Sequence, residues 1–178
     1  MAGEYWTGSS TPYIESGQGD AWGNEAAAQG RSGTQRILKA EEIPAPQEIA
    51  NRLNLPPGTP VIKRQRLILL DERPIELAHS YWPADIAAGT PLASTGKVRG
   101  GAVSLLADLG YEPGAVAEDV QTRPPTREEA EALQLTDNAD WALTLTRTIT
   151  TPDGRPYEVS VMVSPGRIGR LHYSMKVD

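Results

Sequence analysis

Cysteine is absent from this sequence of 178 residues. Its absence excludes disulfides, thiolate metal sites and a cysteine nucleophile, and it fits the reducing environment of the cytoplasm. Only two histidines are present, and no second histidine lies near either of them at a spacing typical of metal ligands. We therefore expect no transition-metal site and no cofactor.

Long apolar runs and clusters of basic residues are missing too. No stretch approaches the roughly 18 consecutive apolar residues of a membrane span, and the first residues lack the basic-then-apolar pattern of a secretory signal. The formal net charge is −6, whereas DNA-binding surfaces normally carry excess positive charge to neutralise phosphates. These features predict a cytoplasmic protein that does not contact nucleic acid or a membrane through these residues.

An internal repeat is the clearest positive signal. The segments "APQEIANRLNL" (45–55) and "PPTREEAEALQL" (124–135) share a proline near the start, a short amphipathic pattern and a final Leu-x-Leu. Similar hairpin sequences follow them, "PVIKRQRLILLDERPIE" and "WALTLTRTITTPDGRPYE". Self-similarity over this length predicts one unit of helix, strand, turn and strand that is used twice.

Alternation of polar and apolar residues indicates how the strands are packed. In "WALTLTRTIT", for example, Leu143, Leu145 and Arg147 fall on one face and the threonines on the other, which is typical of antiparallel sheets. Further strands are expected at 34–44, 114–124 and 170–177, and a helix at 100–110 that ends at Gly110. The predicted fold class is α+β, with a mainly antiparallel sheet of about six strands and flanking helices.

Three arginines, Arg64, Arg66 and Arg147, lie in phase with apolar residues of their strands. Burying an arginine is costly unless its charge is paired. One interpretation is that these side chains hold an anionic ligand group in a cavity. The alternative is that they form ion pairs with Glu76 and Glu158 across the two hairpins.

A second candidate surface is the face of the last long strand that carries Glu158, Ser160 and Met162. It is too polar for a core, and its duplicate in the first unit carries Glu76, Ala78 and Ser80. The two faces predict a pocket between the units, with a solvated sheet face as the alternative. The loop with Lys97, Arg99 and Gly101 precedes a helix, whose first N–H groups attract anions, although an ordinary loop explains it equally well.

Catalytic residues are not predicted. Ser80 adjoins His79, but neighbours on a strand point to opposite faces and cannot act as a couple. Glu76 and Glu158 would be the residues of a glycosidase-like carboxylate pair, and the sequence does not indicate their separation.

Together these segments resemble the UTRA domain, the effector-binding half of GntR-type transcription regulators of the HutC subfamily. The resemblance covers about residues 34–178 and rests on the arginine strand, "LLDERPIELAHSYWP", the Gly-Gly before a helix, "PPTREEAEALQL" and "LTLTRTITTPDGRPYEVSVMV". It implies a chorismate-lyase-like fold, a buried pocket for a small effector and dimerisation through this domain.

By the resemblance, effector contacts fall on Arg64 and Arg66, on the loop of Lys97, Arg99 and Gly101, and on Glu158. The chain differs from sugar-phosphate-sensing members at Ala78, Gly101 and Ser164, where they have a glutamate, a small hydroxyl residue and a tyrosine. These differences argue against a phosphosugar effector. The complete candidate set for ligand binding is Arg64, Arg66, Glu76, Ala78, Ser80, Lys97, Arg99, Gly101, Arg147, Glu158, Ser160 and Met162.

Three functions remain open. The leading hypothesis is the effector-binding domain of a homodimeric regulator, which would bind DNA only through a winged helix-turn-helix that this chain lacks. The alternatives are an enzyme that uses Glu76 or Glu158 for acid–base or cyclisation chemistry, and a stand-alone binder that dimerises with full-length regulators.

The N-terminal segment, residues 1–33, falls outside the resemblance and is predicted to be an arm or linker. It begins with "EYWTGSSTPYIE" and continues into "GDAWGNEAAAQG", a short helix expected to start at Asp20 and end at Gly30. Its aromatic residues predict that residues 4–30 pack on this domain or on a partner subunit, near the mouth of the pocket.

Overall fold

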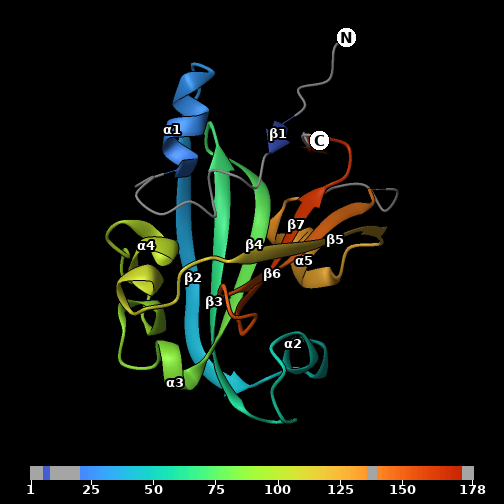
Figure 1. Ribbon diagram of the computed structural model, residues 1–178. Coiled ribbons are helices and arrows are strands. Elements are labelled where there is room, and N and C mark those ends of the chain that lie inside the picture. Colours follow the sequence, from blue (N-terminus) through green and yellow to red (C-terminus); the bar gives the residue numbers. More distant parts are fainter. Residues whose placement is uncertain (1–5, 9–20, 136–139, 174–178) are drawn as a thin grey trace, which may run out of the picture.

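A six-stranded antiparallel sheet forms the centre of the protein, as the computed structural model shows (Figure 1). The structure describes residues 6–8, 21–135 and 140–173. The first copy of the repeat comprises β2 (Gly33–Pro44), α2 (Gln47–Arg52), β3 (Pro60–Leu70) and β4 (Arg73–Pro83). The second comprises β5 (Ala115–Arg123), α5 (Arg127–Ala132), β6 (Ala142–Thr150) and β7 (Pro156–Pro165).

The strand order confirms the duplication. The sheet runs β2-β3-β4-β7-β6-β5, so each strand of the first copy has its counterpart at the mirrored position. At the centre β4 pairs with β7, and His79 lies directly opposite Val161, its equivalent in the repeat. A pseudo-two-fold axis therefore passes between these two residues, and the predicted α+β sheet is correct in class and strand number.

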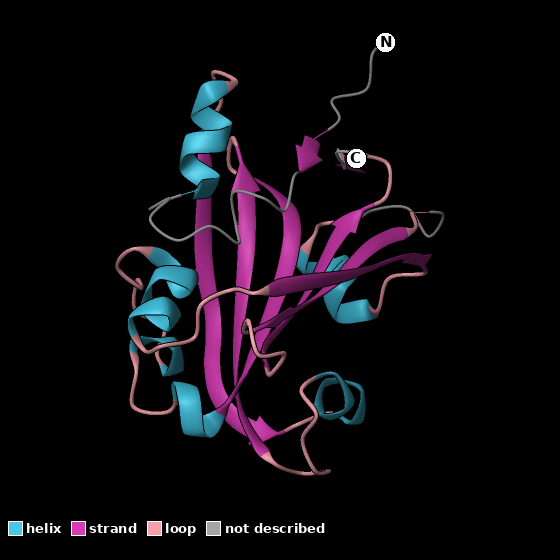
Figure 2. Ribbon diagram, in the orientation of Figure 1, coloured by secondary structure: helices cyan, strands magenta, loops and turns pink. Residues whose placement is uncertain are grey.

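The two repeat helices lie on one face of the sheet, which we call the helix face (Figure 2). Ile49, Ala50 and Leu53 from the region of α2 pack against Val61, Tyr81 and Val159. Leu133, at the end of α5, packs against Leu77 and Val163. The valines of β7 thus belong to the core, as their alternation predicts.

The opposite face, which we call the polar face, is covered at its two ends by different segments. One end carries α3 (Ala84–Ala87), the 3₁₀ helix η2 (Pro91–Ala93) and α4 (Gly101–Asp108). Ile86, Leu92 and Leu106 from these elements bury Trp82 and Ile149. Between the two covered ends lies a band of polar residues.

Helix α1 (Ala21–Ala28) covers the other end through Trp22, which is 6% exposed. The indole packs against Ile68 and Ile75, and its N–H donates to the carbonyl oxygens of Thr34 and Leu69, each 3.1 Å away. Helix α1 therefore packs directly on this end of the sheet. The helix is followed by Gly30, whose φ of 71° matches the expected helix end, while Asp20 lies outside the described residues.

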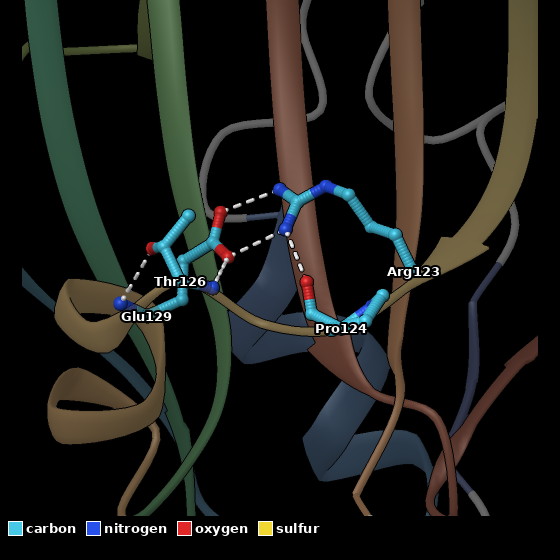
Figure 3. A network of polar contacts seen from close by, with 4 residues as sticks. All are labelled: Arg123, Pro124, Thr126 and Glu129. Carbon is cyan, nitrogen blue, oxygen red and sulfur yellow. Dashed lines mark hydrogen bonds and ion pairs between the residues drawn. The ribbon is translucent and has the colours of Figure 1, made fainter.

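Two local devices hold the repeat units in place. The β3–β4 hairpin turns at Asp71 and Glu72, which both have positive φ, and the Asp71 carboxylate accepts hydrogen bonds from Arg31 and the Ser32 N–H. At the start of α5, Thr126 and Glu129 form a capping box, and Arg123 donates to both carboxylate oxygens of Glu129 (Figure 3). These bonds attach α5 to the end of β5.

The C-terminal strand differs from the expectation. A strand was expected at 170–177, but the structure has only β8 (Gly169–Leu171), and residues 174–177 lie outside the described part. It pairs in parallel with β1 (Trp6–Gly8) in a separate two-stranded sheet, so the arm contacts the C-terminal segment through its backbone. Tyr5, Tyr13, Ile14 and the side chain of Trp6 lie outside what the structure describes.

Within the described residues, no helix combines the length and apolar character needed to cross a bilayer.

Candidate ligand-binding site

A row of polar side chains crosses five strands of the polar face. Strand register aligns Arg64 with Ser80, Ser80 with Ser160, Ser160 with Arg147, and Arg147 with Glu118. Because side chains alternate along a strand, these residues all project to one side of the sheet. The row contains four of the candidates predicted from the sequence, and it passes close to the pseudo-two-fold axis.

The centre of the row is a directional chain of hydrogen bonds. Glu158 accepts from Ser160 Oγ and from Trp82 Nε1, each at 2.9 Å. Ser160 has only one hydroxyl hydrogen, so Ser80, 2.8 Å away, must donate to it. Ser80 in turn accepts from Arg66 Nη2 at 3.3 Å. The chain therefore runs from Arg66 through the two serines to the carboxylate.

Arg147 forms an ion pair with Glu118 on the neighbouring strand β5. Its Nε lies 2.7 Å from Glu118 Oε1, and the two side chains are only 8% and 11% exposed. The Tyr173 hydroxyl, from the C-terminal segment, also bonds to Glu118, and burial together with this acidic partner raises the pKa of Tyr173 to about 12. The charge of Arg147 also opposes the rise in the pKa of Glu76, and the ion-pair alternative stays a prediction for this arginine.

Arg64 is a buried cation held by neutral groups. Its guanidinium donates to the carbonyl oxygens of Pro91, Leu92, Ser94 and Gly96, in and after η2. Burial lowers its pKa, and the like charge of Arg66 adds to that effect. Arg64 therefore fixes the loop that leads to α4, and its predicted contact with a ligand stays a prediction.

Arg66 and Glu76 lie beside the row, on neighbouring strands. Arg66 Nε is buried and has no hydrogen-bond partner among the described atoms. Burial raises the pKa of Glu76, an effect that Arg66 and Arg147 oppose and Glu25 of α1 reinforces. Ala78, on β4, pairs across the sheet with Arg66 of β3 and with Met162 of β7. This part of the polar face thus has hydrogen-bonding capacity that the described chain leaves unused.

The remaining candidates lie away from the row. Lys97 and Arg99 are exposed on the loop before α4, and Gly101 begins that helix with a φ of 84°. Arg64 connects this loop to the row through Ser94 and Gly96, but the lysine and arginine themselves do not reach it. Their role in binding stays a prediction.

A depression of about 450 Å³ lies elsewhere, beside the tip of the β3–β4 hairpin. Its lining includes Arg31, Arg73 and Arg167 and none of the candidate residues. Arg31 and Arg167 already face Asp71 and Asp140. We place the site on the polar face because the buried, convergent polar groups lie there, whereas this depression is an open hollow with most of its charge paired.

His79 and Ser80 lie on opposite faces of the sheet, as expected for neighbours on a strand. His79 projects to the helix face near Lys63 and Glu128, so it lies on the other side of the sheet from Ser80. Nowhere in the described ranges do three or more metal-ligating side chains come together.

Glu118 and Tyr173 were not predicted, whereas Trp82 was placed by its alternation on the same face as Glu76, Ala78 and Ser80. Glu118 shares a face of its strand with Val116 and Val120, so its face could have been inferred, but its partner depends on the β5–β6 register. Tyr173 reaches the row only because the chain turns back after β7. These contacts depend on tertiary structure.

Comparison with known proteins gives consistent results. Residues 28–168 match the family model described as the UTRA domain. An uncharacterized HTH-type transcriptional regulator of Streptomyces coelicolor is 32% identical over 158 residues, which are 86% of this chain and 58% of the relative. A second such regulator, from Rhizobium meliloti, is 32% identical over 70% of this chain and 50% of its own length. The chain thus spans little more than half of these relatives.

Solved structures show the same fold. A protein assigned to the GntR family of transcriptional regulators superposes with a TM-score of 0.76 at 28% identity, covering 85% of this chain and 62% of that one. The effector domain of PhnF from Mycobacterium smegmatis superposes with a TM-score of 0.74 at 20% identity, covering 88% of this chain and 94% of that one.

Proposed function

The chain belongs to the UTRA-domain family, and from this premise we propose that it is the effector-binding domain of a GntR-type transcriptional regulator of the HutC kind. The polar row carries the proposal. Sheet faces that only support a fold bury apolar side chains, whereas here Ser80, Ser160 and Glu158 are at most 7% exposed. Buried polar groups that converge on one region of a largely apolar surface are typical of small-molecule sites.

The ligand would lie on the polar face between the two covered ends. Arg66 offers an unused donor, and the Ser80–Ser160–Glu158 chain holds it in place. Arg64 would act through the loop before α4, which it already binds by four carbonyl oxygens. A ligand that draws on Arg64 would bias the position of α4, and differential affinity for two states is what regulation requires.

The wider assembly is part of the same proposal. Residues 34–178 would form the effector-binding domain and residues 1–33 the arm that connects it to the rest of a regulator. DNA would be bound by a winged helix-turn-helix outside this chain, in agreement with the HTH-type relatives and with the net charge of −6. The working protein would be a cytoplasmic homodimer.

A thermal-shift screen of this chain against small metabolites tests the proposal, since a ligand that binds only the folded state raises the melting temperature. Each hit is then titrated calorimetrically against Arg66→Gln and against Arg127→Gln, the same substitution at a side chain that is 92% exposed. We expect Arg66→Gln to weaken binding about tenfold, the loss of one charge-assisted hydrogen bond, and Arg127→Gln to leave it unchanged. Equal affinity for both variants would place the ligand elsewhere.

A further inference from the structure

Arg66 and Glu76 are oppositely charged neighbours that do not pair. Arg66 opposes Ala78, and Glu76 lies two residues from Ala78 on the same strand and face. The backbones of such diagonal neighbours are about 7–8 Å apart, so long side chains at the two positions can reach each other. The ion pairs recorded among the described residues nevertheless include none between them, and Arg66 Nε is buried without a partner.

The internal repeat shows what a satisfied carboxylate looks like at this position. Glu158, the equivalent of Glu76, accepts from the hydroxyl of Ser160 two residues later and from Trp82. In the first copy, the residue two positions after Glu76 is Ala78, which has no donor to offer. No hydrogen bond to the Glu76 carboxylate is recorded in the described structure. Glu158 thus has one donor on its own strand and one on the first copy, whereas no described group donates to Glu76.

Electrostatics favours a donor at Glu76. Burial raises the pKa of this carboxyl group, and Glu25 adds to the effect, while Arg66 and Arg147 oppose it. A ligand group that donates a hydrogen bond would stabilise the ionised form and offset the cost of burial. A bare anion on Arg66 would instead face the negative charge of Glu76 nearby, and like charges disfavour each other.

We propose that the effector is a small acid that carries a hydrogen-bond donor beside its anionic group, so that Arg66 holds the anion and Glu76 accepts from the donor. This inference rests on the proposed function. An amino acid and a hydroxy acid share this chemistry.

Matched three-carbon probes test the inference. L-Alanine and L-lactate carry an anion and a donor, whereas propionate carries the anion alone, and amide NMR shifts of the chain report binding of each. We expect alanine or lactate to perturb the amides around Ala78 and Met162 and to bind about tenfold more tightly than propionate, as one charge-assisted hydrogen bond predicts. Preference for alanine identifies an amino acid, and preference for lactate a hydroxy acid.

Two variants remove the preference by different routes. Glu76→Gln replaces the carboxylate by an isosteric amide. The affinities of the three probes should then differ by no more than about threefold. Ala78→Ser gives Glu76 the hydroxyl that Glu158 already has, so it should weaken alanine and lactate while propionate changes little. Glu48→Gln, on an exposed helix residue, is the control and should leave the ranking intact.

The outcomes separate this inference from the proposed function. If propionate binds the polar face as tightly as alanine and lactate, or if Glu76→Gln leaves their preference intact, the inferred ligand class is wrong and the effector site stands. If neither these probes nor inorganic phosphate perturbs any amide of the polar face, both the ligand class and the proposed site are refuted.

Discussion

Replacing Glu158 by glutamine should destabilise the protein although the two side chains have the same shape. The carboxylate accepts from Trp82 and Ser160, whereas an amide has one acceptor and one donor end. The indole N–H can only donate, so the amide oxygen must face Trp82 and its NH₂ must face Ser160. Ser160 then has to donate to Ser80, which reverses the chain.

The reversal leaves one hydroxyl hydrogen without an acceptor in the row. Ser80 would receive from both Ser160 and Arg66, and its own hydrogen would have no acceptor there. The two serines are 1% and 3% exposed, so water cannot replace the lost partner. An unsatisfied buried donor costs about 1–3 kcal/mol. Glu158→Leu, which orphans both the indole N–H and the Ser160 hydroxyl, should cost more.

Urea unfolding monitored by tryptophan fluorescence measures the change, with an unchanged m-value as the check that only stability has altered. The control is Glu48→Gln, at a side chain that is 71% exposed, which should lose no more than about 1 kcal/mol. A Glu158→Gln protein as stable as the parent would refute the directional chain.

Three further predictions concern the pairs and the arm around the site. Arg147→Leu should cost about 3–5 kcal/mol in urea unfolding because it leaves Glu118 charged and buried, and adding Glu118→Leu should restore much of that loss; an equal loss in the double variant would show that packing dominates. Burial raises the pKa of Glu129, but its bonds to Arg123 and Thr126 outweigh that effect and lower the pKa below 4.5. The resulting stability is present above pH 4.5 and lost as the pH falls through the lowered value, so Glu129→Gln should flatten unfolding curves recorded across that range; an unchanged pH profile would contradict it. Trp22→Ala should release α1 and speed amide exchange in β2 near Thr34, whereas Trp22→Phe, which keeps most of the packing and loses the N–H, should cost only about 1 kcal/mol; equal exchange in both variants would exclude the packing role.

Much of the sheet could be predicted from the sequence, because a strand has a side-chain period of two. Once "EVSVMV" is recognised as a strand, Glu158, Ser160 and Met162 must share a face, and the valines must occupy the other. The internal repeat also indicated that the two hairpins correspond to one another. For this reason the candidates on β3, β4, β6 and β7 were assigned to the correct face.

The partners of these residues could not be predicted in the same way. An unpaired arginine on an apolar face requires some partner, but the sequence does not distinguish a carboxylate from a set of carbonyl groups. Arg147 contacts Glu118 because the β5–β6 register places them opposite each other. Arg64 donates to carbonyl groups of η2 and of the loop after it because that loop folds back over β3. Both contacts join segments about 30 residues apart or more, so local patterning could not reveal them.

By itself, then, the sequence determined the duplicated unit, the class of the sheet and the face of each long strand, because these follow from local periodicity. The sequence also showed Ala78 where the second copy has Ser160, but only the tertiary structure decided which groups surround each glutamate. Glu158 is enclosed by Trp82 and Ser160, whereas Glu76 faces Ala78 and an arginine whose Nε is unpaired in the described structure. The physical reason is that hydrogen bonding depends on where donors meet in space, and two similar sequences folded into one sheet meet different neighbours.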